Sequence, residues 1–303
     1  MTGRSSNPNP NPMLRPSFLK FFKVSLIGVL ILATVAIWYG CRKEDQTDYS
    51  KSDFVQLKEP SEDQDVVVFE TTEGTFKAVL YEDKAPEYVK YFKELVKDKY
   101  FDGTYVCTIV KNQDGLQAGF LGGSKTADGT TAKDSNTDMT DIEVSADMLP
   151  IKGAIGSLCS EGGVFTTSKA GSVVTFINDV VDSDELKKSV EDTEDANGIK
   201  KVTDIFLEVG GVPNLMQQYT LFGQVFDGWD AYEKICSAEI VDEDKSDEDE
   251  DKNFQPVDDI KFTKVYLSTY GKEKTQSYTI PEKTEPVTTK KQDEAQQETT
   301  KDK

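Results

Sequence analysis

The 303-residue chain carries 35 basic and 55 acidic side chains, which gives a formal net charge of −20, and it contains no histidine. The missing histidine excludes Ser-His-Asp and Cys-His catalysis and removes the commonest metal ligand, so we expect neither a metal nor a cofactor. The acidic charge argues against nucleic acid as a partner, because phosphate binding needs a basic surface.

An uncharged stretch near the N-terminus indicates a membrane anchor. Residues 24–40 have no charged side chain, and the residues before them include basic side chains but no acidic one. A helix over 24–40 would span roughly 25 Å, at the short end of what crosses a membrane. The positive-inside rule then predicts that residues 1–23 are a cytoplasmic basic region and that everything after Cys41 is extracytoplasmic. We therefore expect a protein of the cell membrane.

The sequence leaves open whether this segment is removed. Gly40-Cys41 followed by polar residues resembles the end of a bacterial lipoprotein signal, whose cysteine is lipidated. Trp38 stands where that pattern prefers leucine, so an uncleaved signal anchor is the alternative. Either form tethers the chain to the membrane.

Two polar tracts flank one predicted globular domain. Residues 41–64 are polar and aperiodic, and we expect them to be a linker off the membrane. Residues 269–303 have few apolar positions and many charges of both signs, which predicts a disordered tail. The domain itself is expected over residues 65–268.

The domain has many predicted short strands and few helices. Residues 66–81 hold two apolar runs around Glu73-Gly74, which predicts a hairpin, and Pro86 begins a helical pattern that Gly103 ends. Further strands are predicted at 172–177, 219–225 and 260–267, and further helices at 200–211 and 228–236. This pattern favours a mainly β fold, a barrel or sandwich capped by helices.

The predicted pieces follow one another in the order of a known family. TEGTFKAVLYEDKAPEYVKYFKELVKDKYFDGT resembles the opening of a cyclophilin-type peptidyl-prolyl cis-trans isomerase. Later blocks match that family in the same order: KGAIGS at 152–157, AGS at 170–172, YTLFGQVFDGWDAYEKI at 219–235 and PVDDIKFTKV at 256–265. The resemblance implies an eight-stranded antiparallel barrel capped by two helices, with a peptide groove on one face and an inserted helix before the strand at 219–225.

The resemblance also assigns the catalytic positions, and the residues there have changed. After Asp-Gly-Thr the family usually has an aromatic-His-Arg triplet whose arginine is the main catalytic group. This chain places Val106, Cys107 and Thr108 at those positions. The family's glutamine corresponds to Gln117, in a stretch that carries an extra residue.

The rest of the groove has changed in the same way. In the family's Gly-Ser-Gln-Phe-Phe motif, Val173 replaces the glutamine and Thr175 replaces the second phenylalanine, which formed the wall of the proline pocket. Asn214 stands where Trp or His is usual, Leu215 is kept, and Tyr219 stands where His is common.

The family's chemistry therefore points to two functions. The first is an isomerase with weak activity that assists the folding of exported proteins by acting on their proline-containing segments. The alternative is a noncatalytic peptide- or protein-binding module at the cell envelope, because the single neutral hydroxyl of Thr108 cannot replace the five-donor fork of an arginine.

Two further patterns have ordinary interpretations. The acidic run at 241–251 lacks the glycine and the bidentate glutamate of a calcium loop, which predicts a solvated loop. Cys107, Cys159 and Cys236 show no CxxC spacing, so we expect small buried thiols.

Overall fold

The computed structural model describes residues 47–111, 116–129, 140–160, 169–190, 195, 197–241 and 254–283. Its strands are β1 Asp65–Thr71, β2 Gly74–Leu80, β3 Tyr105–Lys111, β4 Gln117–Ser124, β5 Thr140–Asp141, β6 Ala154–Ser160, β7 Lys169–Ile177, β8 Leu221–Asp227 and β9 Phe262–Thr269. Its helices are η2 Val55–Leu57, α2 Pro86–Lys97, α3 Ser183–Val190, α4 Ile199–Val209, η4 Pro213–Leu215, α5 Trp229–Cys236 and α6 Tyr270–Glu273.

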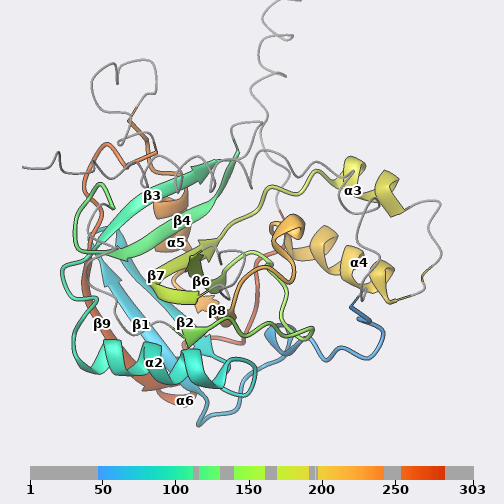
Figure 1. The fold of residues 1–303 in the computed structure, drawn as a ribbon, viewed down its shortest axis with the longest axis horizontal. Coiled ribbons are helices and arrows are strands. Elements are labelled where there is room, and N and C mark those ends of the chain that lie inside the picture. Colours follow the sequence, from blue (N-terminus) through green and yellow to red (C-terminus); the bar gives the residue numbers. More distant parts are fainter. Residues whose placement is uncertain are drawn as a thin grey trace, which may run out of the picture.

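The strands form one curved antiparallel sheet (Figure 1). Eight of them follow the order β3-β4-β7-β6-β8-β2-β1-β9, and the short β5 pairs with β7. The two ends of this path meet at the bridge between Tyr105 and Lys261, beside which Val106 N donates to Ile260 O at 2.9 Å. The mainly β, eight-stranded antiparallel arrangement expected from the sequence is confirmed.

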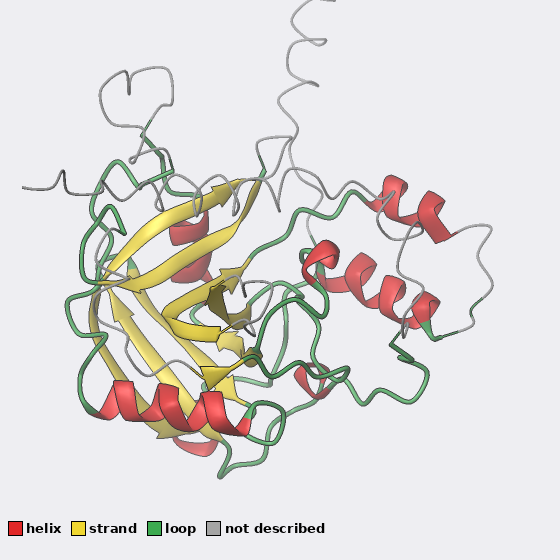
Figure 2. Ribbon diagram, viewed as in Figure 1, coloured by secondary structure: helices red, strands yellow, loops and turns green. Residues whose placement is uncertain are grey.

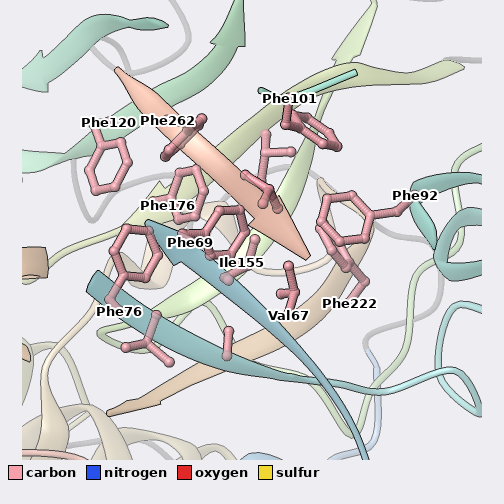
Figure 3. Close-up of a cluster of buried hydrophobic side chains, with 14 of the residues drawn as sticks. Val67, Phe69, Phe76, Phe92, Phe101, Phe120, Ile155, Phe176, Phe222 and Phe262 are labelled. Atoms are coloured by element: carbon pink, nitrogen blue, oxygen red, sulfur yellow. The ribbon is translucent and has the colours of Figure 1, made fainter. Parts of the chain in front are cut away.

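Phenylalanine rings fill the inside of the curved sheet (Figure 3). In the β1–β2 hairpin, Phe69 lies opposite Phe76, and the two rings stack with centroids 4.8 Å apart. Phe120 from β4 and Phe176 from β7 also stack, at 4.4 Å. These rings are fully buried, and because aromatic side chains bury the most apolar area they dominate the stability of the core.

Two helices cover the sheet, as the sequence predicts. In α2, Pro86 occupies the first turn, where its missing N–H costs nothing, and one face of the helix is buried through Tyr88, Val89 and Phe92. In α5, the buried Tyr232 donates its hydroxyl to Ile177 O at 2.7 Å. Both helices are therefore anchored by an apolar face together with polar contacts to the sheet.

A pair of helices is inserted between β7 and β8, where the sequence predicted only one. Helices α3 and α4 lie beside the curved sheet rather than over it (Figure 2). The apolar face of α4 predicted from its spacing is confirmed, with Val202, Phe206 and Val209 buried. It packs in a second hydrophobic cluster, separate from the phenylalanine core.

Residues 47–64 of the predicted linker and residues 269–283 of the predicted tail pack against the rest of the domain. We call residues 47–64 the N-terminal strap and residues 269–283 the C-terminal strap. Tyr49 and Phe54 are buried in the α4 cluster, and the side chain of Gln56 is fully buried.

Tyr278 of the C-terminal strap stacks on Phe226 and donates its hydroxyl to Gln56 O at 2.5 Å. The sequence pattern failed here because isolated aromatic residues in a polar tract have no period, yet each can still fill a hollow on the domain.

Several sequence predictions concern residues outside those described. They are the basic region 1–23, the apolar segment 24–40, Cys41, residues 242–251 of the acidic run and the tail beyond residue 283. Among the described residues, no helix is long and apolar enough to cross a membrane. Cys107 and Cys236 are buried, as predicted.

Candidate functional site

A small, partly open pocket lies where strands β3, β4, β6 and β7 meet the segment that precedes β8. Its volume is about 30 Å³. Aliphatic and aromatic side chains make most of its wall. The lining residues are Val110, Ala118, Gly119, Leu121, Leu158, Thr175, Phe176, Ile177, Leu215 and Tyr219.

The floor of the pocket comes from the pairing of β4 with β7. Leu121 lies opposite Thr175, and Gly119 lies opposite Ile177. Gly119 has a φ of +147°, and a Cβ there would lie 2.0 Å from Phe176 O. Only glycine therefore permits this close approach of the two strands beneath the pocket.

The remaining wall is a short irregular segment after the inserted helices. Pro213–Leu215 forms the 3₁₀ helix η4, which places the buried Leu215 against the pocket, and Tyr219 follows one turn later. The segment is attached to the domain at its start, where Val212 N donates to Pro150 O at 2.9 Å. Leu215 and Tyr219 thus face the strands from a separate element.

The structure gathers some of the predicted groove residues around this pocket. Thr175, Leu215 and Tyr219 all line it. Val173 borders it, because it packs in a small buried cluster with Cys107 and the pocket residue Leu121.

Thr108 belongs to the same face of the sheet. It is the direct cross-strand partner of Leu121, while its neighbour Ile109 points into the phenylalanine core. Opposed residues in a sheet project from the same side, so Thr108 lies beside the pocket without lining it.

The structure places two predicted residues elsewhere. Val106 is packed in the phenylalanine core, so its assignment to the groove is corrected. Gln117 lies opposite Lys111, and its Nε2 donates to Ala238 O at 3.2 Å. The pairing of β3 with β4 puts Leu121 across from Thr108 and leaves Gln117 three residues along β3, across from Lys111.

Asn214 also falls outside the pocket lining. It lies half-buried within η4, and its backbone carbonyl oxygen accepts a hydrogen bond from Gln218 Nε2 at 2.5 Å. The neighbouring Leu215 points toward the pocket from the same short helix.

Sequence reasoning missed several residues of the wall. They are Val110, Ala118, Leu121, Leu158 and Ile177. Each lies in a strand with mixed burial, where an apolar residue facing a groove has the same sequence pattern as one facing the core. Only the register of the strands distinguishes the two faces.

The site lacks strong cationic donors. The chain's arginines are Arg4, Arg15 and Arg42, all before the described residues, and there is no histidine. Consequently no guanidinium or imidazole from the domain can face the pocket. Among the described residues, no cluster of carboxylates and thiols could hold a metal ion.

The pocket is also small for its expected ligand. An engineered apolar cavity of about 150 Å³ holds one benzene ring, whereas this pocket measures about 30 Å³. The pocket therefore encloses only part of a five-membered prolyl ring, and the rest of the ring would lie in its open mouth.

Comparisons with known proteins identify the relatives of this chain. Residues 66–265 match the family described as cyclophilin type peptidyl-prolyl cis-trans isomerase/CLD. A relative from Staphylococcus saprophyticus assigned as a peptidyl-prolyl cis-trans isomerase is 26% identical over 179 residues, which cover 59% of this chain and 84% of the relative. One from Staphylococcus aureus is 26% identical over 188 residues, which cover 62% of this chain and 89% of the relative.

Solved structures with a similar arrangement include a cyclophilin type peptidyl-prolyl cis-trans isomerase from Cryptosporidium parvum. Its crystal structure in the presence of the dipeptide Ala-Pro has 15% sequence identity and a TM-score of 0.46, and covers 67% of this chain and 99% of that one. A second crystal structure of the same enzyme gives 16% identity and the same TM-score, and covers 68% and 98%.

Proposed function

The chain belongs to the cyclophilin-type peptidyl-prolyl cis-trans isomerase family, and from that premise we propose that its pocket binds proline-containing segments of exported proteins and isomerises X–Pro bonds only weakly. The absence of any arginine from the domain carries this proposal. Membership of the family indicates the class of ligand, which is a proline-containing peptide. The residues of the pocket then limit the rate of X–Pro isomerisation.

Isomerisation requires breaking the resonance of the amide bond. The barrier is ~18–20 kcal/mol, and an uncatalysed X–Pro bond exchanges in tens of seconds or more. A guanidinium lowers this barrier by donating hydrogen bonds that favour the twisted amide. One charge-assisted hydrogen bond is worth ~1.5–3 kcal/mol, so its loss slows catalysis roughly ten- to 150-fold.

Thr108 cannot recover this contribution. Its hydroxyl is neutral, short and a single donor, and its cross-strand partner Leu121 is apolar. The pocket can still contribute by holding the proline in an apolar environment, which favours the less polar, twisted amide. Weak isomerisation is therefore the expected outcome.

The alternative function is peptide binding without catalysis. The observation that favours it is an apolar pocket beside Thr108, the position to which the family resemblance assigns the catalytic arginine. Binding needs only complementary shape and desolvation, whereas turnover also needs donors aimed at the twisted state.

We assign the protein's location from the sequence alone. The uncharged segment 24–40, preceded only by basic charges, supports a membrane-tethered chain whose domain lies on the extracytoplasmic side. Protease added to intact cells without their outer wall layers should digest the domain. Protection until lysis would refute this location, and an acyl chain on Cys41 would identify a lipoprotein.

A protease-coupled assay tests the catalytic proposal. The full chain is mixed with an Ala-Pro peptide whose cleavage requires the trans isomer, and binding of a fluorescent version of the peptide is followed in parallel. Binding with turnover well below that of an arginine-bearing family member supports weak isomerase activity. Binding with no turnover supports the binding module, and turnover equal to that of the family member contradicts both.

A further inference from the structure

The inserted helices α3 and α4 leave the domain after β7 and rejoin it before β8, beside the sheet (Figure 1). We call the place where they leave and rejoin the domain the root of the insert. Val180 N donates to Gly211 O at 3.1 Å, so the first and last residues of the insert lie side by side. The carboxylate of Asp179 closes the same root, because its Oδ1 accepts hydrogen bonds from Val181 N at 2.9 Å and Gly211 N at 3.0 Å.

The backbone at the root is shaped to admit this carboxylate. Gly210 ends α4 with a φ of +73°, and a Cβ there would lie 2.3 Å from the carboxyl carbon of Asp179. Glycine is needed for both reasons, since other residues rarely adopt this φ and any side chain would displace the carboxylate. Gly211 continues the close approach, with a hypothetical Cβ only 2.4 Å from Pro150 O.

The root connects two walls of the pocket. Ile177, two residues before Asp179, lines the pocket from β7. Gly211, whose backbone N donates to the Asp179 carboxylate, begins the segment that carries Leu215 and Tyr219. One side chain therefore joins the strand wall to the irregular wall, across the point where the insert would otherwise let them separate.

Charged groups from three other elements surround this carboxylate. Lys152 comes from the loop before β6 and forms an ion pair with Glu233 of α5. Lys283 belongs to the C-terminal strap, and the backbone N of Lys283 donates to Glu208 O of α4 at 2.8 Å. Burial raises the pKa of Asp179, while the two backbone donors and these lysines oppose that rise.

We propose that Asp179 is a positioning residue of the pocket: by closing the root it holds the Leu215–Tyr219 wall against the strands and so sets the affinity for X–Pro peptides. This role rests on the proposed function. The insert can then move at its far end without opening the groove.

The test compares variants of Asp179 in the full chain. Asp179→Ala removes the acceptor, and Asp179→Asn keeps an acceptor oxygen without the charge. Asp182→Ala is the matched control, because the exposed Asp182 also accepts two backbone N–H bonds, at 2.9 Å each, but at the start of α3 instead of the root. Hydrogen exchange of residues 211–219 reports on closure, and anisotropy of a fluorescent Ala-Pro peptide reports on affinity.

The expected result is specific to Asp179. Asp179→Ala should speed exchange over 211–219 and weaken peptide binding by about tenfold or more, as expected for lost bonds to a charged acceptor. Asp179→Asn should restore most of both properties, and Asp182→Ala should change neither.

Two outcomes would overturn the proposal. Unchanged exchange in a folded Asp179→Ala protein would show that the carboxylate does not close the root. Faster exchange with undiminished affinity would show that closure does not position the pocket. If the unmodified chain binds no X–Pro peptide, the proposed function fails, and exchange alone still decides whether Asp179 closes the root.

Discussion

Replacing Thr108 by arginine should raise the rate at which the protein isomerises X–Pro bonds. Thr108 is half-buried on β3, directly opposite the pocket residue Leu121 and on the side of the sheet away from the phenylalanine core. A long side chain at that position can extend over the pocket mouth. Its guanidinium would then donate to the amide of a bound X–Pro peptide.

The size of the gain follows from two opposing effects. One charge-assisted hydrogen bond would contribute ~1.5–3 kcal/mol, or roughly ten- to 150-fold in rate. The pocket of about 30 Å³ opposes this, because it encloses only part of a prolyl ring and so holds the X–Pro bond less firmly beside the arginine. We therefore expect a rise in kcat/KM below that range for the single variant, and a larger one only when the pocket residues are changed as well.

The assay is the protease-coupled cleavage of an Ala-Pro peptide by the full chain, with two controls. Thr108→Lys adds a charge without the planar fork and should gain less. Thr263→Arg places the same substitution on the exposed part of β9, where Thr263 Oγ1 donates to Glu70 O, and should gain nothing. A folded Thr108→Arg protein with an unchanged rate would refute the placement of the arginine position at Thr108.

Three further predictions concern the folded unit and the root of the insert. Because both straps bury aromatic side chains worth ~1.5–3 kcal/mol each, the fragment 65–268 should melt more than about 5 °C below the fragment 47–283, and equal melting temperatures would show that the straps do not pack. Burial raises the pKa of Asp179 above its ordinary 3.8, so the closed root binds the proton more tightly than an open root. Closure is therefore favoured at low pH and weakens as the pH rises through the raised pKa, which hydrogen exchange of residues 211–219 can follow. The same pH trend in Asp179→Asn, which has no carboxylate to titrate, would contradict this prediction. Gly210→Ala should lower the melting temperature by several degrees more than Gly103→Ala. Both glycines have φ above +70°, but only Gly210 faces the Asp179 carboxylate, so equal decreases in the melting temperature would rule out that contact.

The helices were predictable because each is specified locally. Pro86 at the first turn, together with apolar residues at helical spacing, places α2 correctly, and the same spacing identifies α4 and α5. The insert was harder to predict. Helix α3 is short, and Leu186 and Val190 are its only apolar residues, which is too few to show a helical period in the sequence.

The straps show where sequence patterns mislead. Their tracts are polar on average, and that average predicts solvated chain. Yet Gln56 is fully buried, because its amide donates to Leu149 O and Gln224 Oε1 while its own oxygen accepts Leu149 N at 2.7 Å. A polar side chain can be a core residue when every group it carries is paired, and nothing local in the sequence shows such partners.

The sequence by itself determined the class of fold, the family and the absence of arginine from the domain, because each depends on residue identity or on the order of local blocks. Only the tertiary structure decided which residues make the pocket. A shift of one residue in strand pairing exchanges the two faces of a sheet, and only the observed pairing of β3 with β4 shows that Leu121 faces Thr108 while Gln117 faces Lys111. The closure of the root likewise depends on residues 32 positions apart, Asp179 and Gly211, that meet only when the insert folds back on the domain.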